Sequence, residues 1–335
     1  MNPKRGPMFE GVLFFPVTPF ASEESVDLPI LAEHVRRGVA AGAGGVFVAC
    51  GTGEFPALGP EEYAAAVRTA VEVVDGRVPV FAGAGGVPAA ARQYARAARD
   101  AGADGLLLMP PYLAQGPAAG LVGYVRRIAA ATDLPLIVYQ RGTARFDVPS
   151  ALEVARMPQV VGFKDGLGDL DLMSRIVTAV RADERTGGGD FQFFNGMPTA
   201  EAFVPAYRAI GVELYSSAAF CFAPEVSLAF HRAVTGGDEA AAEALLSAFV
   251  RPLVALRDRV PGYAVALVKA GVRQSGLDVG GVRPPLVDPT EEDLAELSRI
   301  TEAGRALVSR LATASGESGA AQSGSAPEPA AEAAR

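Results

Sequence analysis

The chain has 335 residues, half of them apolar, which suffices for one large α/β domain with a sizeable core. Its net charge of -8 argues against nucleic acid and against an anionic membrane surface as partners, and no apolar run approaches the ~18 residues of a membrane span. Two cysteines and two histidines, far apart in sequence, form no disulfide framework and no metal site, so we expect a cytoplasmic protein without a bound metal.

Short apolar runs alternate with Ala- and Arg-rich stretches over the first 220 residues. Strands are predicted at 11–15, 45–49, 78–82, 105–109, 134–139, 160–164, 191–195 and 212–216. Helices are predicted between them at 28–41, 60–74, 88–101, 118–131, 150–156, 170–182 and 198–209. This alternation predicts an α/β fold, a (β/α)8 TIM barrel. A doubly wound sheet is the alternative, although no Gly-x-Gly-x-x-Gly follows the first strand.

The alternation stops after the eighth strand. Four further helices are predicted, at 223–235, 238–257, 262–275 and 290–312. We therefore expect a barrel over 1–220 and a C-terminal helical extension over 221–312 that packs on it, with Arg283-Pro284-Pro285 as an anchor. Residues 313–335 consist mainly of Ala, Ser, Gly, Glu and Pro, a composition that predicts a disordered tail.

Lysine is rare in this chain, since only Lys4, Lys164 and Lys269 accompany its many arginines. Lys164 ends the sixth predicted strand, where burial would disfavour the ammonium form. A neutral amine can form a Schiff base with a carbonyl substrate. The alternative is an amine that extends out of the strand end to pair with a carboxylate such as Asp165.

The other candidate residues also follow predicted strands, because barrel enzymes place their functional groups at the C-terminal strand ends. After the second strand, Gly51, Thr52 and Gly53 offer backbone N–H groups and a hydroxyl to a carboxylate, although a simple tight turn would have the same sequence. Further strand ends supply Tyr112, Tyr139, Arg141, Asn195, Gly196 and Ser216.

Tyr139 and Lys164 end neighbouring strands, so the phenol can transfer protons to and from an intermediate on the amine. The alternative is a tyrosine at the edge of the core whose hydroxyl bonds to backbone. Cys50 has no histidine nearby and is interpreted as a small packed residue rather than a nucleophile.

Together these motifs resemble the dihydrodipicolinate synthase and N-acetylneuraminate lyase superfamily of Schiff-base barrels, from Gly11 to about Leu311. The matching segments are 16–20, 51–54, 139, 162–165 and 282–285. The resemblance implies that Lys164 forms the imine, that Tyr139 is the general acid/base, and that the chain is a homo-oligomer, either a tetramer or a dimer of dimers. We expect no cofactor, because the imine itself is the electron sink.

Segments 50–55, 138–141 and 162–169 look like the 5-dehydro-4-deoxyglucarate dehydratase branch, and Gly51 stands where synthases and lyases carry a hydroxyl residue. That branch converts a sugar diacid to 2,5-dioxopentanoate, water and carbon dioxide. A diacid requires two anion-binding positions. Thr52 with the flanking glycine backbone suits the carboxylate beside the imine, and Arg141, or else Arg145, suits the other.

Three other functions are consistent with these residues. A pyruvate-dependent aldolase would use the same Lys164 and Tyr139 but release pyruvate. A non-catalytic barrel could bind a sugar acid as a regulator. A phosphate-binding metabolic barrel would need a glycine nest after strands seven and eight, where the chain has 195–196 and 216–217 instead.

Overall fold

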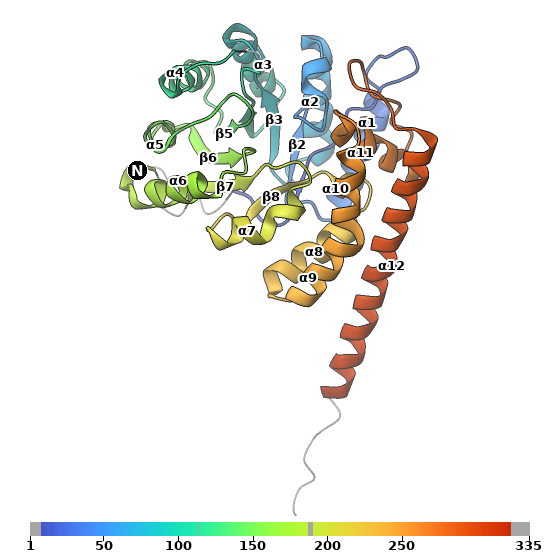
Figure 1. Ribbon diagram of the computed structural model, residues 1–335. Helices are drawn as coiled ribbons and strands as arrows, with labels where there is room; N and C mark the ends of the chain where they lie inside the picture. Colours follow the sequence, from blue (N-terminus) through green and yellow to red (C-terminus); the bar gives the residue numbers. More distant parts are fainter. Residues whose placement is uncertain (1–7, 113, 187–189, 323–335) are drawn as a thin grey trace, which may run out of the picture.

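The computed structural model describes residues 8–112, 114–186 and 190–322 (Figure 1). Eight parallel strands close a barrel in sequence order, with β1 hydrogen-bonded to both β2 and β8. The strands are β1 (Leu13–Phe14), β2 (Gly45–Val48), β3 (Val80–Ala84), β4 (Gly105–Leu108), β5 (Leu136–Gln140), β6 (Val160–Asp165), β7 (Gln192–Asn195) and β8 (Leu214–Ser217). Each overlaps a predicted strand, and the predicted (β/α)8 barrel is confirmed.

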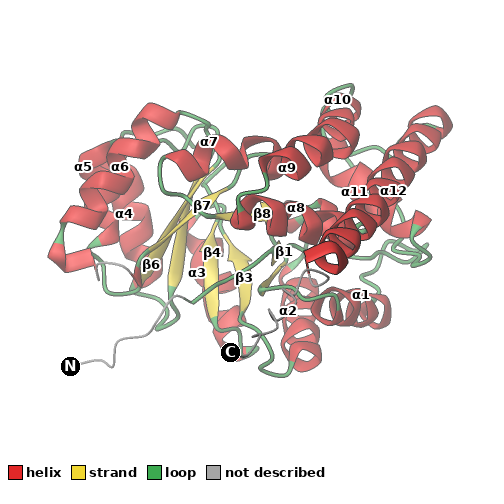
Figure 2. Cartoon of the chain, turned by 90° about the horizontal axis from the view of Figure 1, so that it is seen from below, coloured by secondary structure: helices red, strands yellow, loops and turns green. Residues whose placement is uncertain are grey.

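The barrel helices surround the strands, as Figure 2 shows from below. They are α1 (Leu28–Ala40), α2 (Pro60–Val74), α3 (Pro88–Asp100), α4 (Ala118–Ala129), α5 (Val148–Ala155), α6 (Leu170–Ala182) and α7 (Val204–Ala209). Their starts follow local signals: the Asp27 and Asp169 side chains cap α1 and α6, and proline occupies the first turn of α2. The predicted helix 198–209 is wrong in its first part, where a loop and the 3-10 turn η4 (Ala200–Phe203) precede α7.

Aromatic rings fill the barrel interior at the N-terminal end of the strands. The ring of Phe9, which precedes β1, lies 5.2 Å from that of Phe47, 4.9 Å from that of Phe81 and 5.9 Å from that of Phe194. Phe15 stacks on Phe47 at 4.5 Å. This arrangement leaves space for a ligand only toward the C-terminal strand ends, the side on which barrel enzymes carry their sites.

The C-terminal extension consists of helices packed against one side of the barrel. They are α8 (Pro224–Gly236), α9 (Glu239–Leu245), the π-helical segment η6 (Leu246–Val250), α10 (Arg251–Arg257), α11 (Tyr263–Gln274) and α12 (Glu291–Gln322). A single helix over 238–257 was expected, and the π turn of η6 divides it. None of the helices in the described part of the chain is both long and apolar enough to span a membrane.

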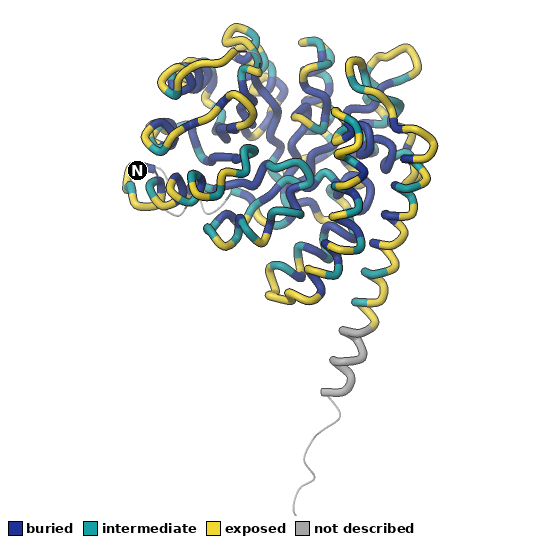
Figure 3. The backbone as a smooth tube through the Cα atoms, in the orientation of Figure 1, coloured by how far each residue is buried: buried dark blue, intermediate teal, exposed yellow. Residues whose placement is uncertain are grey.

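The anchor expected at Arg283 is present. Its guanidinium donates to the Glu62 carboxylate and to the carbonyl oxygen of Ala57, at 2.8 and 2.7 Å, and so ties the extension to the start of α2. Helix α12 runs away from the barrel (Figure 1), and up to residue 313 its outer surface is exposed (Figure 3). It continues to Gln322, past residue 313 where a disordered tail is expected. Residues 323–335 of that segment lie outside the described residues.

Candidate active site

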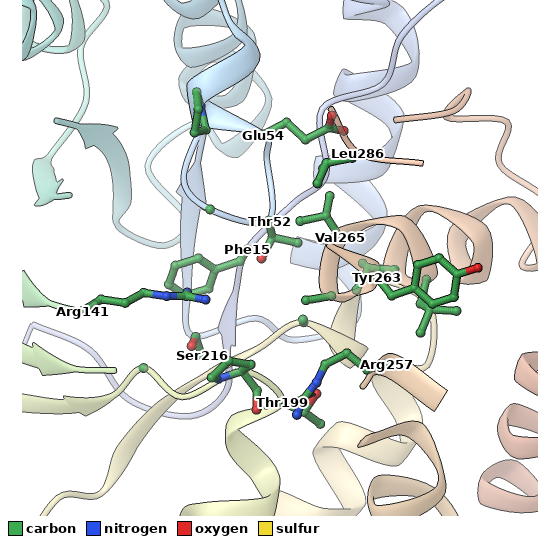
Figure 4. A pocket seen from close by; sticks show the side chains of 18 of the residues that line it. Phe15, Thr52, Glu54, Arg141, Thr199, Ser216, Arg257, Tyr263, Val265 and Leu286 are labelled. Carbon is green, nitrogen blue, oxygen red and sulfur yellow. Dashed lines mark hydrogen bonds between the residues drawn. The ribbon is translucent and has the colours of Figure 1, made fainter. Parts of the chain in front are cut away.

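A cavity of about 450 Å³ opens at the C-terminal ends of the strands (Figure 4). The loops after the strands form one wall, and α10, α11 and the segment 283–286 form the other. Eight of the ten residues predicted for the site line this cavity: Gly51, Thr52, Tyr112, Tyr139, Arg141, Lys164, Gly196 and Ser216. The structure therefore brings together residues that are as much as 165 positions apart in sequence, as the barrel topology predicts.

Lys164 is the central titratable group of the cavity. It lies opposite Tyr139 in the register of β6 with β5, and its side chain is almost completely buried. The Nζ atom is 4.1 Å from the ring centroid of Phe15 and 4.9 Å from that of Tyr139. Burial, assisted by the positive charge of Arg141, lowers the pKa of Lys164 to about 7. A substantial fraction of the amine is thus neutral, and nucleophilic, near neutral pH.

Asp165 does not pair with this amine, so the alternative interpretation of Lys164 is not supported. Successive side chains of a strand point to opposite faces, and the Asp165 carboxylate lies outside the barrel lining. It accepts hydrogen bonds from Gln140 Nε2 at 2.8 Å, from the Tyr207 hydroxyl and from the backbone N–H of Leu167. Among the residues that the structure describes, Lys164 forms no ion pair.

The Tyr139 hydroxyl lies between two partners. It donates to the carbonyl oxygen of Gly196 at 2.8 Å and accepts from Arg141 Nη1 at 3.2 Å. Burial raises the pKa of Tyr139, and the charge of Arg141 opposes this effect. The phenol therefore stays protonated at neutral pH and can act as a proton donor with Arg141 available to stabilise the phenolate.

Gly196 makes the close approach of these groups possible. A Cβ atom at this position would lie 2.6 Å from Lys164 Cε and 2.8 Å from Tyr139 Cε2. Any larger residue would displace the lysine or the tyrosine, so the predicted site residue Gly196 acts through the absence of a side chain and through its carbonyl oxygen.

The loop after β2 places Thr52 in the cavity wall and Gly53 behind it. Gly53 is buried, does not line the cavity, and its carbonyl oxygen accepts from Thr18 Oγ1 at 2.6 Å. At Gly51 a Cβ atom would have only Met109 Cε as a neighbour, 3.9 Å away. Packing alone does not require glycine at position 51, and its presence leaves space in the cavity.

Asn195 is the second predicted residue that does not reach the cavity. Its Nδ2 donates to the carbonyl oxygen of Ala200 at 2.9 Å, and its Oδ1 accepts from the N–H of Met197 at 3.1 Å. The side chain thus fixes the loop that follows β7. Arg145, the alternative to Arg141, is exposed at 3.9 Å from Asp169 and also lies outside the lining.

The remaining predicted residues lie at the rim and on the floor. Ser216 lines the cavity from β8, and Tyr112 does so from the loop after β4, where it is 42% exposed with a left-handed backbone φ of 24°.

Cys50 is fully buried, and burial raises the pKa of its thiol to about 12, which agrees with a packed residue rather than a nucleophile. The described residues contain no cluster of three His, Cys, Asp or Glu side chains that could hold a metal.

A buried ion pair supports the loop after β2. Glu54, in left-handed conformation with φ of 54°, places Oε1 2.8 Å from Lys269 Nζ on α11, and its Oε2 accepts from the N–H of Arg283 at 3.0 Å. Lys269 also donates to the carbonyl oxygen of Gly281 at 2.6 Å. Burial lowers the pKa of Lys269, and the Glu54 carboxylate opposes this effect. Because both of its contacts are with the protein, the Lys269 amine has a structural role.

The sequence did not predict the wall formed by the extension. Arg257, Tyr263, Val265 and Leu286 of the extension line the cavity, as does Thr199 from the loop between β7 and η4 (Figure 4). They lie in helices and loops whose position over the barrel mouth has no local sequence signal. The rarity of lysine was a signal for Lys269, but nothing in the sequence pairs it with Glu54.

The model of the dihydrodipicolinate synthetase family matches residues 8–304. The chain is 59% identical over 298 residues to a probable 5-dehydro-4-deoxyglucarate dehydratase 1 of Streptomyces coelicolor, covering 89% of this chain and 94% of the relative. It is 46% identical to a probable 5-dehydro-4-deoxyglucarate dehydratase of Ralstonia nicotianae, covering 90% and 93%. The crystal structure of dihydrodipicolinate synthase from Oceanobacillus iheyensis superposes with a TM-score of 0.81 at 26% identity, covering 89% and 97%.

Proposed function

Because the chain belongs to the dihydrodipicolinate synthetase family, we propose that Lys164 forms a Schiff base with a keto acid and that the enzyme is a decarboxylating 5-dehydro-4-deoxyglucarate dehydratase. The observation that carries the proposal is the buried amine of Lys164, with its pKa lowered to about 7, beside the Tyr139 hydroxyl in one cavity. Three relatives that carry the dehydratase name are 56% to 59% identical over most of the chain, which selects the branch.

The first half of the reaction builds the imine. The neutral Lys164 amine attacks the keto carbon, and Tyr139 supplies the proton with which the carbinolamine oxygen leaves as water. The carboxylate beside the keto carbon lies against Thr52 and the backbone of Gly51, which is open to the cavity. Because Arg141 Nη1 is 3.2 Å from the Tyr139 oxygen, we assign Arg141 to this imine end of the substrate rather than to the far end.

The second half uses the imine as an electron sink. A proton leaves the adjacent methylene to give an enamine, and the enamine expels the next hydroxyl as water. The far carboxylate then departs as carbon dioxide, and its bonding electron pair passes through the conjugated system to the imine nitrogen. Protonation and hydrolysis release 2,5-dioxopentanoate and return Lys164 to its free form, so one water and one carbon dioxide are lost for each diacid.

Product analysis tests the proposal against the aldolase alternative. The purified enzyme should release about one carbon dioxide for each 5-dehydro-4-deoxyglucarate consumed and accumulate 2,5-dioxopentanoate. Pyruvate with an aldehyde as products would instead support the aldolase. Borohydride in the presence of the diacid should add the ligand mass to the peptide that contains Lys164. An enzyme that turns over nothing and traps no adduct would be a sugar-acid-binding barrel.

We further propose that the chain works as a cytoplasmic homo-oligomer, a tetramer or a dimer of dimers. Its two cysteines, Cys50 and Cys221, are buried and unbridged, which suits a reducing compartment. The large apolar side chains of Val87 and Tyr112 are exposed on neighbouring loops of the barrel mouth and are candidates for a subunit contact. Sedimentation at micromolar concentration tests the assembly, and a single species of about 34.5 kDa would contradict it.

A further inference from the structure

The wall of the cavity opposite Arg141 carries a second cation. Arg257, the last residue of α10, lines the cavity with its side chain only 14% exposed. In Figure 4 Arg141 and Arg257 come from opposite sides of the cavity, and the end of the Arg257 side chain lies beside Thr199. Around Arg257 the extension contributes mainly apolar groups, among them Leu253, Val265 and Leu286. Arg283 also lines this wall, but its guanidinium is paired with the Glu62 carboxylate. Arg257 is therefore the better placed of the two cations to meet a ligand.

Arg257 holds the hydroxyl of Thr199 in place. Its Nη1 donates to Thr199 Oγ1 at 2.9 Å and to the carbonyl oxygen of Pro198 at 2.7 Å. With Oγ1 accepting from the guanidinium, the Thr199 hydroxyl proton is directed away from Arg257 and is available to a ligand. Thr199 also lines the cavity, so the pair offers an O–H donor backed by a positive charge.

The backbone of Thr199 is held in an unfavourable conformation. Its φ of 49° lies in the left-handed region, which a β-branched residue adopts only at a cost of about 1–3 kcal/mol. Within the described part of the chain, Glu54, Tyr112 and Thr199 are the cavity-lining residues other than glycine with positive φ. Such strain is found where the position of a side chain matters for function, and here it presents a hydroxyl to the cavity.

We propose that Thr199 and Arg257 bind the far carboxylate of the sugar diacid and thereby select a diacid over a mono-acid. The inference rests on the proposed function, which requires a second anion-binding position away from the imine. Arg141, beside Tyr139, serves the imine end. Helix α10 lies across the same cavity, on the side where the far end of a chain that starts at Lys164 and Thr52 needs a partner.

The charge balance at Arg257 suits a carboxylate that must leave as carbon dioxide. Its Nε and Nη2 atoms lie 2.9 and 2.8 Å from Asp258 Oδ1, so the cation is partly neutralised before substrate binds. A strong, uncompensated ion pair would stabilise the carboxylate in the ground state and lose that stabilisation as the charge departs. Arg257, already partly neutralised by Asp258, still orients the carboxylate, and less ground-state stabilisation is lost when carbon dioxide leaves.

The test compares two substrates in two sets of variants. The diacid is assayed for turnover, and 2-oxopentanoate, which has the keto acid but no far carboxylate, is assayed by borohydride trapping. Arg257→Met should raise KM for the diacid by about 10- to 100-fold, the loss of a charge-assisted hydrogen bond, while kcat stays within about threefold. Trapping of 2-oxopentanoate should be unchanged. Arg251→Met, on the same helix but outside the cavity, is the matched control and should behave as the wild type.

A second pair of variants keeps the test informative if Arg257→Met fails to fold. Thr199→Ala and Thr199→Ser both remove the methyl group and differ only in the hydroxyl, so the alanine variant should raise KM for the diacid several-fold more than the serine variant. An unchanged KM in Arg257→Met, equal effects on both substrates, or identical alanine and serine variants would overturn the assignment. Wild-type carbon dioxide release is measured separately, so a failure of the proposed function is distinguishable from a failure of the subsite.

Discussion

At the scale of single residues, the chemistry depends on how two ordinary side chains are desolvated. The pKa of Lys164 is lowered because the amine is enclosed between the rings of Phe15 and Tyr139 and lies near the cation Arg141. The pKa of Tyr139 is raised by the same enclosure. The two pKa shifts are opposite in direction but have the same consequence for charge. At neutral pH both groups tend to be uncharged, the amine as a nucleophile and the phenol as an acid.

The pH dependence of the reaction follows from the lowered pKa of Lys164. Below about pH 7 the amine is protonated in the free enzyme and cannot attack the keto carbon. We expect kcat/KM to rise tenfold per pH unit through the acid range and to level off above about pH 7. A profile of kcat/KM against pH measures this. An acid limb near the ordinary lysine pKa of 10.5 would contradict the assigned role.

Removal of Arg141 should change both binding and titration. The charge of Arg141 lowers the pKa of Lys164, so in Arg141→Ala the acid limb of kcat/KM moves to higher pH. Loss of a cation at the imine end should also reduce kcat/KM at the optimum by about 10- to 100-fold. Arg145→Ala, which changes an exposed arginine outside the cavity, is the control. If Arg145→Ala and Arg141→Ala had the same effect, the imine-end assignment would fail.

At the scale of elements, the loop after β2 is held from the extension rather than from the barrel alone. Glu54 lies two residues after Thr52 and is bound by Lys269 of α11 and by the N–H of Arg283. The Glu54 and Lys269 side chains are, respectively, 1% and 0% exposed. Two buried charges compensate each other here, and the position of the loop after β2 depends on a helix more than 200 residues later in sequence.

Breaking this ion pair should cost substantial stability. Lys269→Met leaves the Glu54 carboxylate buried and unpaired, for which we expect a loss of about 3–5 kcal/mol in the free energy of unfolding. The double variant Glu54→Gln/Lys269→Met should recover part of that loss, because no charge is left uncompensated. Denaturant titration of the two variants checks this. Glu243→Gln, which breaks an exposed pair with Arg251, is the comparison and should cost no more than about 1 kcal/mol.

The sequence predicts those elements whose signals are local. Short apolar runs predicted all eight strands to within two residues at each end. Strand ends are where a barrel carries its functional groups, so Lys164 and Tyr139 could be found. Asn195 shows that a strand-end position alone does not identify a site residue, since a polar side chain there can equally well bond to its own loop. Arg257 shows another limit, because its role depends on how the extension packs over the barrel.

At the scale of the whole molecule, the extension completes a cavity that the barrel leaves open. Helices α10 and α11 and the segment 283–286 form the wall opposite the strand ends. Helix α12 packs against α8, α11 and η6 and holds these elements together. The packing of α12 on the rest of the protein involves Leu297 and Ile300, which are buried, and Leu307 and Val308, which are half-buried.

Removal of residues 313–335 should therefore have little effect on the enzyme. The apolar side chains with which α12 joins the core precede this segment, and its own composition has too little apolar content to add to that core. We expect the truncated chain to keep kcat, KM, Tm and oligomeric state near those of the full chain. A drop in Tm of several degrees, or a change in sedimentation, would show that the segment contributes contacts.

The aromatic rings around Phe9 also set the route that molecules must take. Because these rings occupy the barrel axis beneath Lys164, the diacid enters and the aldehyde product leaves by the same mouth, past the helices of the extension. Because substrate and product share one opening, a second diacid cannot bind until the first product has left the cavity. Product at high concentration should therefore act as a competitive inhibitor of the diacid.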